Sequence, residues 1–100
     1  MPYTLLYHPK VREEDIPALN RRMQQRIYKA IETRLTTEPE KYGRPLKGTL
    51  KGYWKLRVGD YRVVYKIVES DVLILGILHR KEIYGNMTKR LKWQSQRQKK

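Results

Sequence analysis

The sequence predicts an α+β fold: an N-terminal strand, two helices, a three-stranded antiparallel meander and a short C-terminal helix. Two observations lead to this prediction. Residues 51–84 contain three strand-like runs separated by short polar turns. An amphipathic helical pattern lies upstream, at residues 21–36. Consecutive strands with short connections pair antiparallel, and the two helices precede this meander instead of alternating with its strands, as in α+β proteins.

The N-terminal segment predicts one strand and one short helix. Residues 3–8 alternate between two faces, one of which carries Tyr3, Leu5 and Tyr7. Residues 10–15 are charged and start a short helix, which Pro17 interrupts or restarts after one turn. We therefore expect the long helix to begin only after this proline.

Residues 21–36 predict that long helix, with Asn20 as its N-cap. An apolar stripe at helical spacing forms the side that packs on the core: Met23, Ile27, Ala30, Ile31 and Leu35. The opposite side is polar and mostly basic: Arg22, Gln25, Arg26, Lys29 and Glu32. We interpret this basic side as ordinary solvated surface.

The meander is predicted from the runs at residues 53–58, 61–68 and 72–78, which are rich in aromatic and β-branched side chains. Gly59-Asp60 forms the first turn and residues 69–71 form the second. Trp54, Tyr61 and Tyr65 are expected in the core rather than as base-stacking platforms.

A connection rich in proline, glycine and basic residues, 38–50, precedes the meander. Such a loop can contact a phosphate backbone or can be an ordinary solvated loop, and the sequence leaves both readings open. Residues 82–86 form a turn and residues 87–93 a brief helix. We predict a single domain over residues 1–93, followed by a basic tail, 94–100, that is disordered when free.

Strand alternation predicts where the basic side chains of the meander gather. Lys55 and Arg57 share one face of their strand, and Arg62 shares a face with Val64 and Lys66 in the next strand. Arg80 has the parity of Val72, Ile74 and Leu78, and His79 has the opposite parity. A meander can bring Lys55, Arg57, Arg62 and Arg80 to one side of the sheet. Because these cations repel one another unless an anion lies on them, this side is predicted to bind phosphate.

Net charge also points to a polyanionic partner. The chain of 100 residues has a net charge of +13, no cysteine and only two histidines. Residues 1–40 carry seven basic and six acidic side chains, a net of +1, and residues 41–100 carry sixteen and four, a net of +12. Such asymmetry favours nucleic acid, with an anionic membrane surface or an acidic protein as alternatives. No apolar run is long enough for a membrane span or a signal peptide, so a cytoplasmic protein is expected.

The sequence lacks the residues that most kinds of catalytic site require. Neither histidine has carboxylates at metal-ligand spacing, and no serine lies in a nucleophile elbow. Metal-free RNA cleavage remains, because the 2′-hydroxyl nucleophile belongs to the substrate and the protein needs only to orient phosphate, stabilise charge and move protons. The candidates are Lys55, Arg62, His79, Arg80 and Tyr84.

Each candidate also has a structural reading. Lys55 can be an outward-facing strand residue, Arg80 a solubilising strand end, and Tyr84 a packing residue at the sheet edge. Arg62 is harder to explain as core, because it lies in an otherwise apolar strand. His79 is as readily a packed or capping residue as a catalytic one, and His8 is expected to be structural.

Three segments resemble the RelE/ParE toxin superfamily: PLKG at residues 45–48, YWKLRVGDYRVVY at 53–65 and HRKEIY at 79–84. The order of the upstream strand and helices agrees, so the resemblance covers about residues 3–93. It implies the fold described above and a toxin of a type II toxin–antitoxin module, held inactive by a cognate antitoxin. RelE-like members cleave mRNA in the ribosomal A site and leave a 2′,3′-cyclic phosphate, whereas ParE-like members inhibit DNA gyrase.

The resemblance also implies roles for individual residues. Arg62 and Arg80 would hold and stabilise the phosphate, Lys55 would stabilise charge or assist the base, and Tyr84 would stack on or orient the nucleotide. His79 is the alternative proton carrier. This chain has Tyr53 where the RelE pattern has a second lysine, so the identity of the general base stays open.

These observations predict a RelE-type, ribosome-dependent mRNA endoribonuclease that needs no metal or other cofactor. Its partners would be the ribosome, mRNA and an antitoxin, and its RNA contacts would include Arg44, Lys47, Lys51 and Arg57. A gyrase inhibitor without nuclease activity and an inactive RNA-binding module are the alternatives.

Overall fold

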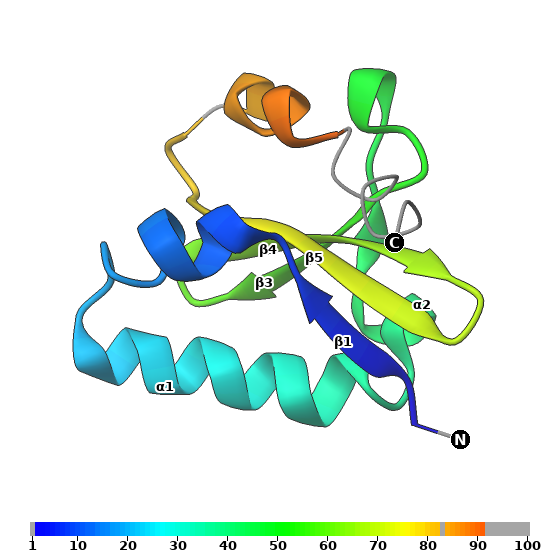
Figure 1. Cartoon of the computed structure of the whole chain (residues 1–100), viewed down its shortest axis with the longest axis horizontal. Helices are drawn as coiled ribbons and strands as arrows, with labels where there is room; N and C mark the ends of the chain where they lie inside the picture. Colours follow the sequence, from blue (N-terminus) through cyan, green and yellow to red (C-terminus); the bar gives the residue numbers. More distant parts are fainter. Residues whose placement is uncertain (1, 83, 92–100) are drawn as a thin grey trace.

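A five-stranded sheet forms the centre of the computed structural model, which describes residues 2–82 and 84–91. The strands lie in the order β1-β5-β4-β3-β2 (Figure 1). They are β1 (Thr4–Tyr7), β2 (Arg44–Pro45), β3 (Trp54–Val58), β4 (Tyr61–Val68) and β5 (Asp71–His79). The predicted meander is confirmed as β3-β4-β5, joined by antiparallel pairings. The sequence did not predict the parallel pairing of β1 with β5 or the short strand β2.

The predicted helices are present, whereas α2 (Pro39–Tyr42) and η3 (Gly48–Leu50) lie in the connection, residues 38–50, for which the sequence predicted no helix. Helix α1 (Arg21–Ala30) continues as the π-helical segment η2 (Ile31–Leu35), and Asn20 caps it by accepting a hydrogen bond from the Met23 amide at 2.8 Å. The other short helical segments are η1 (Val11–Asp15) and η4 (Tyr84–Arg90). The C-terminal helix therefore begins three residues before the predicted start. The predicted end of that helix and the tail after it lie outside the described residues.

Two apolar layers lie on the two faces of the sheet. Helix α1 and η2 cover one face, where Ile27, Ile31 and Leu35 pack against Val63 and Tyr65. The other face holds a smaller cluster, in which Tyr53, Val64 and Leu78 pack beneath Leu50 of η3 and Met87 of η4. Figure 1 shows α1 below the sheet and η4 above it. Most of the basic strand residues belong to this second face, called here the η4 face.

A β-bulge in β5 changes which side chains share a face. Val64 lies opposite Gly76 but Tyr65 lies opposite Ile74, so Leu75 is the extra residue. Before the bulge Ile74 packs towards α1, whereas after it Leu78 packs on the η4 face. The prediction that Arg80 shares a face with Val72 and Ile74 is therefore wrong, although it holds for Leu78. Within residues 2–82 and 84–91, no helix has the length and apolar character needed to cross a membrane.

Candidate active site

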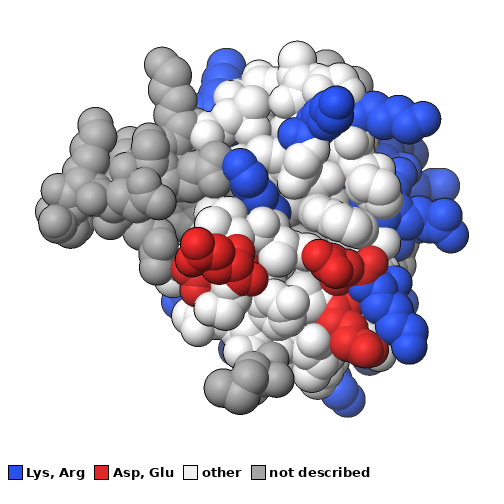
Figure 2. Space-filling view, turned by 90° about the vertical axis from the view of Figure 1, so that its right-hand side faces the viewer, with Lys and Arg blue, Asp and Glu red and all other residues white. Residues whose placement is uncertain are grey.

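Positive charge is distributed unevenly over the molecular surface. In Figure 2, lysine and arginine side chains gather along one margin of the view, and acidic side chains lie nearer its middle. Within the sheet, the β3–β4 register places Lys55 opposite Val64 and Arg57 directly opposite Arg62. Lys55, Arg57 and Arg62 therefore share the η4 face, as the sequence predicted. Like charges directly opposite each other destabilise a sheet, and no carboxylate among the described residues pairs with Arg57 or Arg62.

Arg62 is the most constrained of these cations. Its Nη1 donates a hydrogen bond to the backbone carbonyl of Arg80 at 3.3 Å, and its guanidinium lies 6.0 Å from the ring centroid of Tyr84. Its Nε is buried and has no hydrogen-bond partner among the described residues. Backbone and aromatic contacts thus hold the guanidinium in place without neutralising its charge. An anionic ligand that reached it would find a fixed bidentate donor.

Arg80 extends this cluster into solvent. Its amide donates to the Asp60 carbonyl at 2.8 Å, which fixes its backbone to the β3–β4 turn. Its Nε lies 3.6 Å from the Asp60 carboxylate, and both side chains are more than half exposed. Such an exposed ion pair is weak, so a phosphate can replace Asp60 at little cost. The structure thus brings Arg62 and Arg80 together, as the sequence predicted.

Tyr84 closes one side of the cluster. It is partly buried at the start of η4 and packs against the apolar cluster of the η4 face. Its hydroxyl is buried and has no hydrogen-bond partner among the described residues. A buried hydroxyl without a partner costs free energy.

The remaining predicted RNA contacts surround the same face. Leu46 and Leu50 pack onto the apolar cluster of this face, so the connection that carries the exposed Lys47 and Lys51 lies over it. The exposed Arg44 of β2 lies opposite Lys55 of β3 in the register of the two strands. This basic connection therefore lies over the η4 face next to the start of β3.

Two residues lie outside this cluster. Tyr53 is only 6 % exposed, and burial raises the pKa of its phenol, so it is a core residue rather than a replacement for a lysine base. His79 pairs with Tyr61, which packs towards α1, so it lies across the sheet from Arg62. Its ring packs edge-on against Tyr61 at 5.1 Å, and its Nδ1 accepts a hydrogen bond from the Lys81 amide at 3.1 Å. Through these contacts His79 caps the end of β5, and its ring lies away from the arginine cluster.

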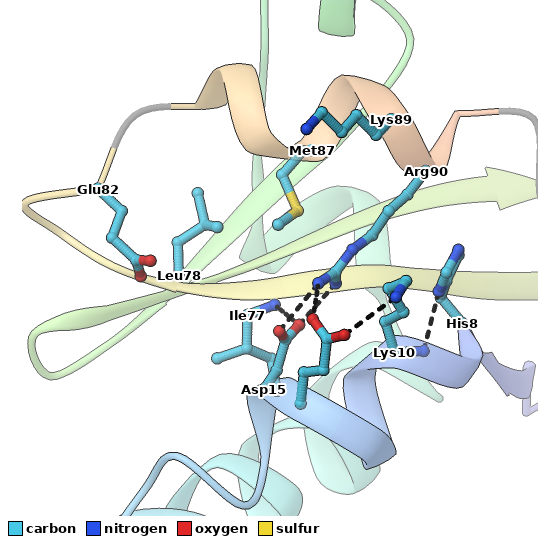
Figure 3. Close-up of a pocket in the computed structure, with 10 residues that line it drawn as sticks. His8, Lys10, Asp15, Ile77, Leu78, Glu82, Met87, Lys89 and Arg90 are labelled. Carbon is cyan, nitrogen blue, oxygen red and sulfur yellow. Dashed lines mark hydrogen bonds and ion pairs between the residues drawn. The ribbon is translucent and has the colours of Figure 1, made fainter.

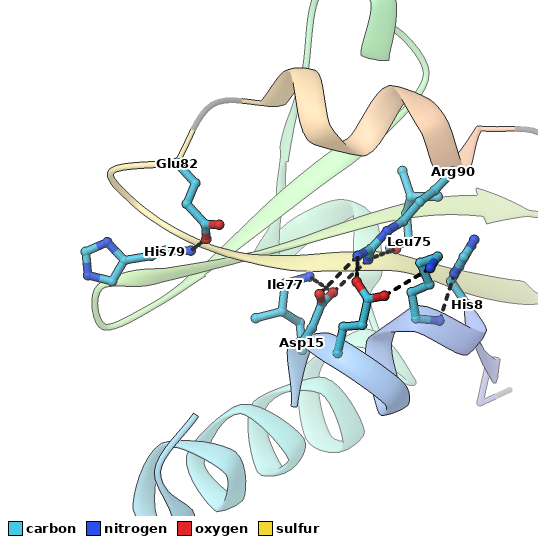
Figure 4. Close-up of polar contacts among 9 residues, drawn as sticks. His8, Asp15, Leu75, Ile77, His79, Glu82 and Arg90 are labelled. Carbon is cyan, nitrogen blue, oxygen red and sulfur yellow. Dashed lines mark hydrogen bonds and ion pairs between the residues drawn. The ribbon is translucent and has the colours of Figure 1, made fainter. Parts of the chain in front are cut away.

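A cleft of about 480 Å³ lies elsewhere, between η1, β5 and η4 (Figure 3). The Arg90 guanidinium, 9 % exposed, spans it and donates to both carboxylate oxygens of Asp15 at 2.8 and 3.1 Å. Arg90 also donates to the carbonyl of Leu75 in the bulge, and Asp15 accepts from the Ile77 amide (Figure 4). These polar groups satisfy one another. We therefore interpret the Asp15–Arg90 pair and its backbone partners, called here the latch, as a structural network that holds η4 on the sheet.

His8 borders this latch and is nearly buried, as the structural reading predicted. Its Nδ1 accepts a hydrogen bond from the Lys10 amide at 3.0 Å. Burial, followed by the positive charge of Arg90, lowers the pKa of His8. No sequence pattern marked Asp15 and Arg90 as partners, because 75 positions separate them. Among the described residues, no group of histidine and acidic side chains is arranged to hold a metal ion.

Comparison with known proteins gives concordant results. The family model of the ParE toxin of the type II toxin–antitoxin system parDE matches residues 3–84. Toxin RelG of Mycobacterium tuberculosis is 34 % identical over 86 residues, which are 84 % of this chain and 98 % of RelG.

Solved structures show the same relationship at the level of the fold. A chain of the RelBE2 toxin–antitoxin complex from Mycobacterium tuberculosis is 31 % identical with a TM-score of 0.75, over 82 % of this chain and 95 % of that one. A chain of the archaeal RelE–RelB complex from Pyrococcus horikoshii is 25 % identical with a TM-score of 0.63, over 83 % and 100 % of the two chains.

Proposed function

This chain belongs to the RelE/ParE superfamily of type II toxin–antitoxin toxins, and on that premise we propose that it is a ribosome-dependent endoribonuclease that cleaves mRNA in the A site. The observation that carries the proposal is the pairing of Arg57 with Arg62 beside Arg80, without a neutralising carboxylate at Arg62. A scissile phosphate is the ligand that this arrangement accommodates best, because it takes bidentate arginine contacts and offsets the repulsion.

The reaction requires little covalent chemistry from the protein. The 2′-oxygen attacks the adjacent phosphorus as its proton passes to a base, and the 5′-oxygen leaves and takes up a proton. The products are a 2′,3′-cyclic phosphate and a 5′-hydroxyl. Arg62 and Arg80 bind the non-bridging oxygens and stabilise the charge that accumulates on them. Lys55, on the same face, stabilises this charge or assists the base.

Tyr84 orients the nucleotide next to that phosphate. Its ring already lies against the Arg62 guanidinium, and its hydroxyl has no protein partner among the described residues. A base or ribose that accepts a hydrogen bond from this hydroxyl would be held against the arginines. In this proposal His79 orders the end of β5 and does not carry a proton.

An antitoxin is the proposed protein partner. The similar chain from Mycobacterium tuberculosis was solved in a toxin–antitoxin complex, and that from Pyrococcus horikoshii in a RelE–RelB complex. A partner that inhibits this chain would have to cover Arg62 and Arg80 or neutralise them, and an acidic segment would do both. The ribosome would supply the second surface, through phosphate contacts to Lys47 and Lys51 that weaken as salt rises.

Primer extension on a programmed ribosome tests the proposal. Wild-type protein should cut the A-site codon only when ribosomes are present. Arg80→Ala should abolish the cuts, whereas Arg22→Ala, which removes the same charge from the exposed side of α1, should not. Uncut mRNA with wild-type protein would reject the proposal.

The ParE description of the matching family model favours inhibition of DNA gyrase as the second candidate. A gyrase supercoiling assay with wild-type protein separates the two functions. If neither mRNA cleavage nor gyrase inhibition is seen, an inactive RNA-binding module remains, and Arg80→Ala would then change only RNA affinity.

A further inference from the structure

Two adjoining hollows flank the outer edge of β3. One, of about 220 Å³, lies between α1, η2 and β3, and the other, of about 140 Å³, lies between η2, α2, β2 and β3. Arg34 and Arg57 line both, so the two hollows are neighbours, and together they are called here the α1–β3 groove. Its lining includes six cationic residues and no acidic one: Arg26, Lys29, Arg34, Arg44, Lys55 and Arg57.

The groove changes the interpretation of the basic side of α1. From sequence, Arg26 and Lys29 are ordinary solvated residues in the half of the chain that carries little net charge. In the structure, the Arg26 guanidinium lies over the β3–β4 turn, where a Cβ built on Gly59 would be 3.0 Å from Arg26 Nη1. Folding therefore places cations of α1 beside Arg57, although 28 or more positions separate them in the chain. Such a concentration of one sign attracts a polyanion.

An exposed aromatic ring lies in the same groove. Tyr42 is 46 % exposed, which makes it the large hydrophobic residue left open among the described ones. The Arg34 guanidinium lies 5.8 Å from its ring centroid. Tyrosine rings and guanidinium planes both stack on unpaired bases, and they do so with little dependence on sequence.

We propose that the α1–β3 groove binds single-stranded RNA, with phosphates on its cations and a base stacked on Tyr42. The inference rests on the proposed function for the identity of the ligand. Lys55 and Arg57 line the groove and belong to the strand that also borders Arg62. One RNA strand can therefore pass from the scissile phosphate around the edge of β3 into the groove. The exposed aromatic favours RNA over an acidic peptide, which needs no stacking surface, and over duplex RNA, whose bases are already stacked.

Fluorescence anisotropy tests this assignment. The probe is a labelled single-stranded RNA of about 12 nucleotides, with 2′-O-methyl groups that prevent cleavage, and the salt concentration is varied. Arg26→Ala combined with Lys29→Ala should weaken binding and lower the salt slope by about 0.7 for each phosphate that the protein no longer neutralises. Tyr42→Ala should weaken binding about fivefold or more with the slope unchanged.

The matched control is Arg21→Ala combined with Arg22→Ala, which removes the same charge from the exposed start of the same helix. Circular dichroism confirms that each variant is folded. Equal losses in the control and the groove variant would overturn the inference, because net charge alone would then explain binding. Unchanged RNA binding in the groove variants, with weaker binding of the cognate antitoxin, would also overturn it and assign the groove to an acidic protein segment.

Failure of the groove proposal can be distinguished from failure of the proposed nuclease function. If wild-type protein leaves mRNA uncut but the groove variants still lose affinity for the uncleavable RNA, the RNA-binding groove is supported and the nuclease function is rejected. If wild-type protein cuts mRNA but the groove variants bind RNA normally, the nuclease function is supported and the RNA-binding groove is rejected.

Discussion

Removing the carboxylate of Asp15 should destabilise this protein more than most single substitutions. Asp15 and Arg90 are 10 % and 9 % exposed and share two hydrogen bonds, and Asp15 also accepts one from the Ile77 amide. In Asp15→Ala the Arg90 guanidinium stays under η4 without its partner, and the Ile77 amide loses its acceptor. Figure 4 shows these bonds converging on Asp15.

The magnitude follows from the buried charge. Breaking a buried pair from one side costs about 3–5 kcal/mol, and the exposed Glu14, 3.8 Å from Arg90, offsets part of this cost. We therefore expect a loss of about 3 kcal/mol, the lower end of that range. For a domain of this size, such a loss lowers Tm by roughly 12–24 °C.

Urea unfolding and thermal melts measure the effect. Glu14→Gln is the matched control, because it removes a neighbouring carboxylate that is 55 % exposed, and it should leave Tm nearly unchanged. The double variant Asp15→Ala/Arg90→Met should recover more than half of the loss, since no buried charge then lacks a partner. A loss below about 1 kcal/mol in Asp15→Ala, typical of exposed pairs, would refute the latch.

Three further predictions concern the same face and its neighbours. Gly76→Ala should cost about 1–3 kcal/mol in urea unfolding, because its Cβ would collide with the Met87 sulfur and approach Arg90 Nη1 to 2.9 Å; wild-type stability would show that η4 does not lie on Gly76. Burial and Arg90 lower the pKa of folded His8, so its contribution to stability should be complete above about pH 6.5 and decline as the pH falls through the lower folded value. The free energy of unfolding should therefore differ less between about pH 5.5 and 7.5 in His8→Asn than in the wild-type protein. Equal pH-dependent differences in the two proteins would contradict this. Tyr84→Phe should leave Tm unchanged or slightly higher, because the hydroxyl is buried without a partner, but should slow single-turnover cleavage about tenfold if one hydrogen bond to the nucleotide is lost; an unchanged rate would exclude that hydrogen bond.

The elements of the fold were accessible from sequence because they depend on local periodicity. The strands at residues 61–68 and 72–78, the Gly59-Asp60 turn and the Asn20 cap all lie where neighbouring side chains predict them. The grouping of Lys55 and Arg57 followed from alternation within one strand. Their grouping with Arg62 needed only a short turn, which limits the possible registers.

Interactions between distant segments could not be predicted in this way. The bulge at Leu75 places Ile74 and Leu78 on opposite faces, although alternation alone assigns them to the same one. No local pattern marks a bulge whose carbonyl is satisfied by Arg90, a residue from another element. The burial of Tyr53, where the family pattern suggests a lysine, likewise depends on η3 and η4 packing above it.

The sequence by itself determined the order of the main elements, which are β1, α1 and the β3-β4-β5 meander, together with the family and the cations of the meander, because each depends on neighbouring residues or on composition. Only the tertiary structure decided which of these cations gather at Tyr84, that His79 lies across the sheet from Arg62, and that Arg26 of α1 lies beside Arg57. The physical reason is that pairing register and helix docking are set by packing over the whole core, and a residue's neighbours in space depend on contacts that its neighbours in sequence do not encode.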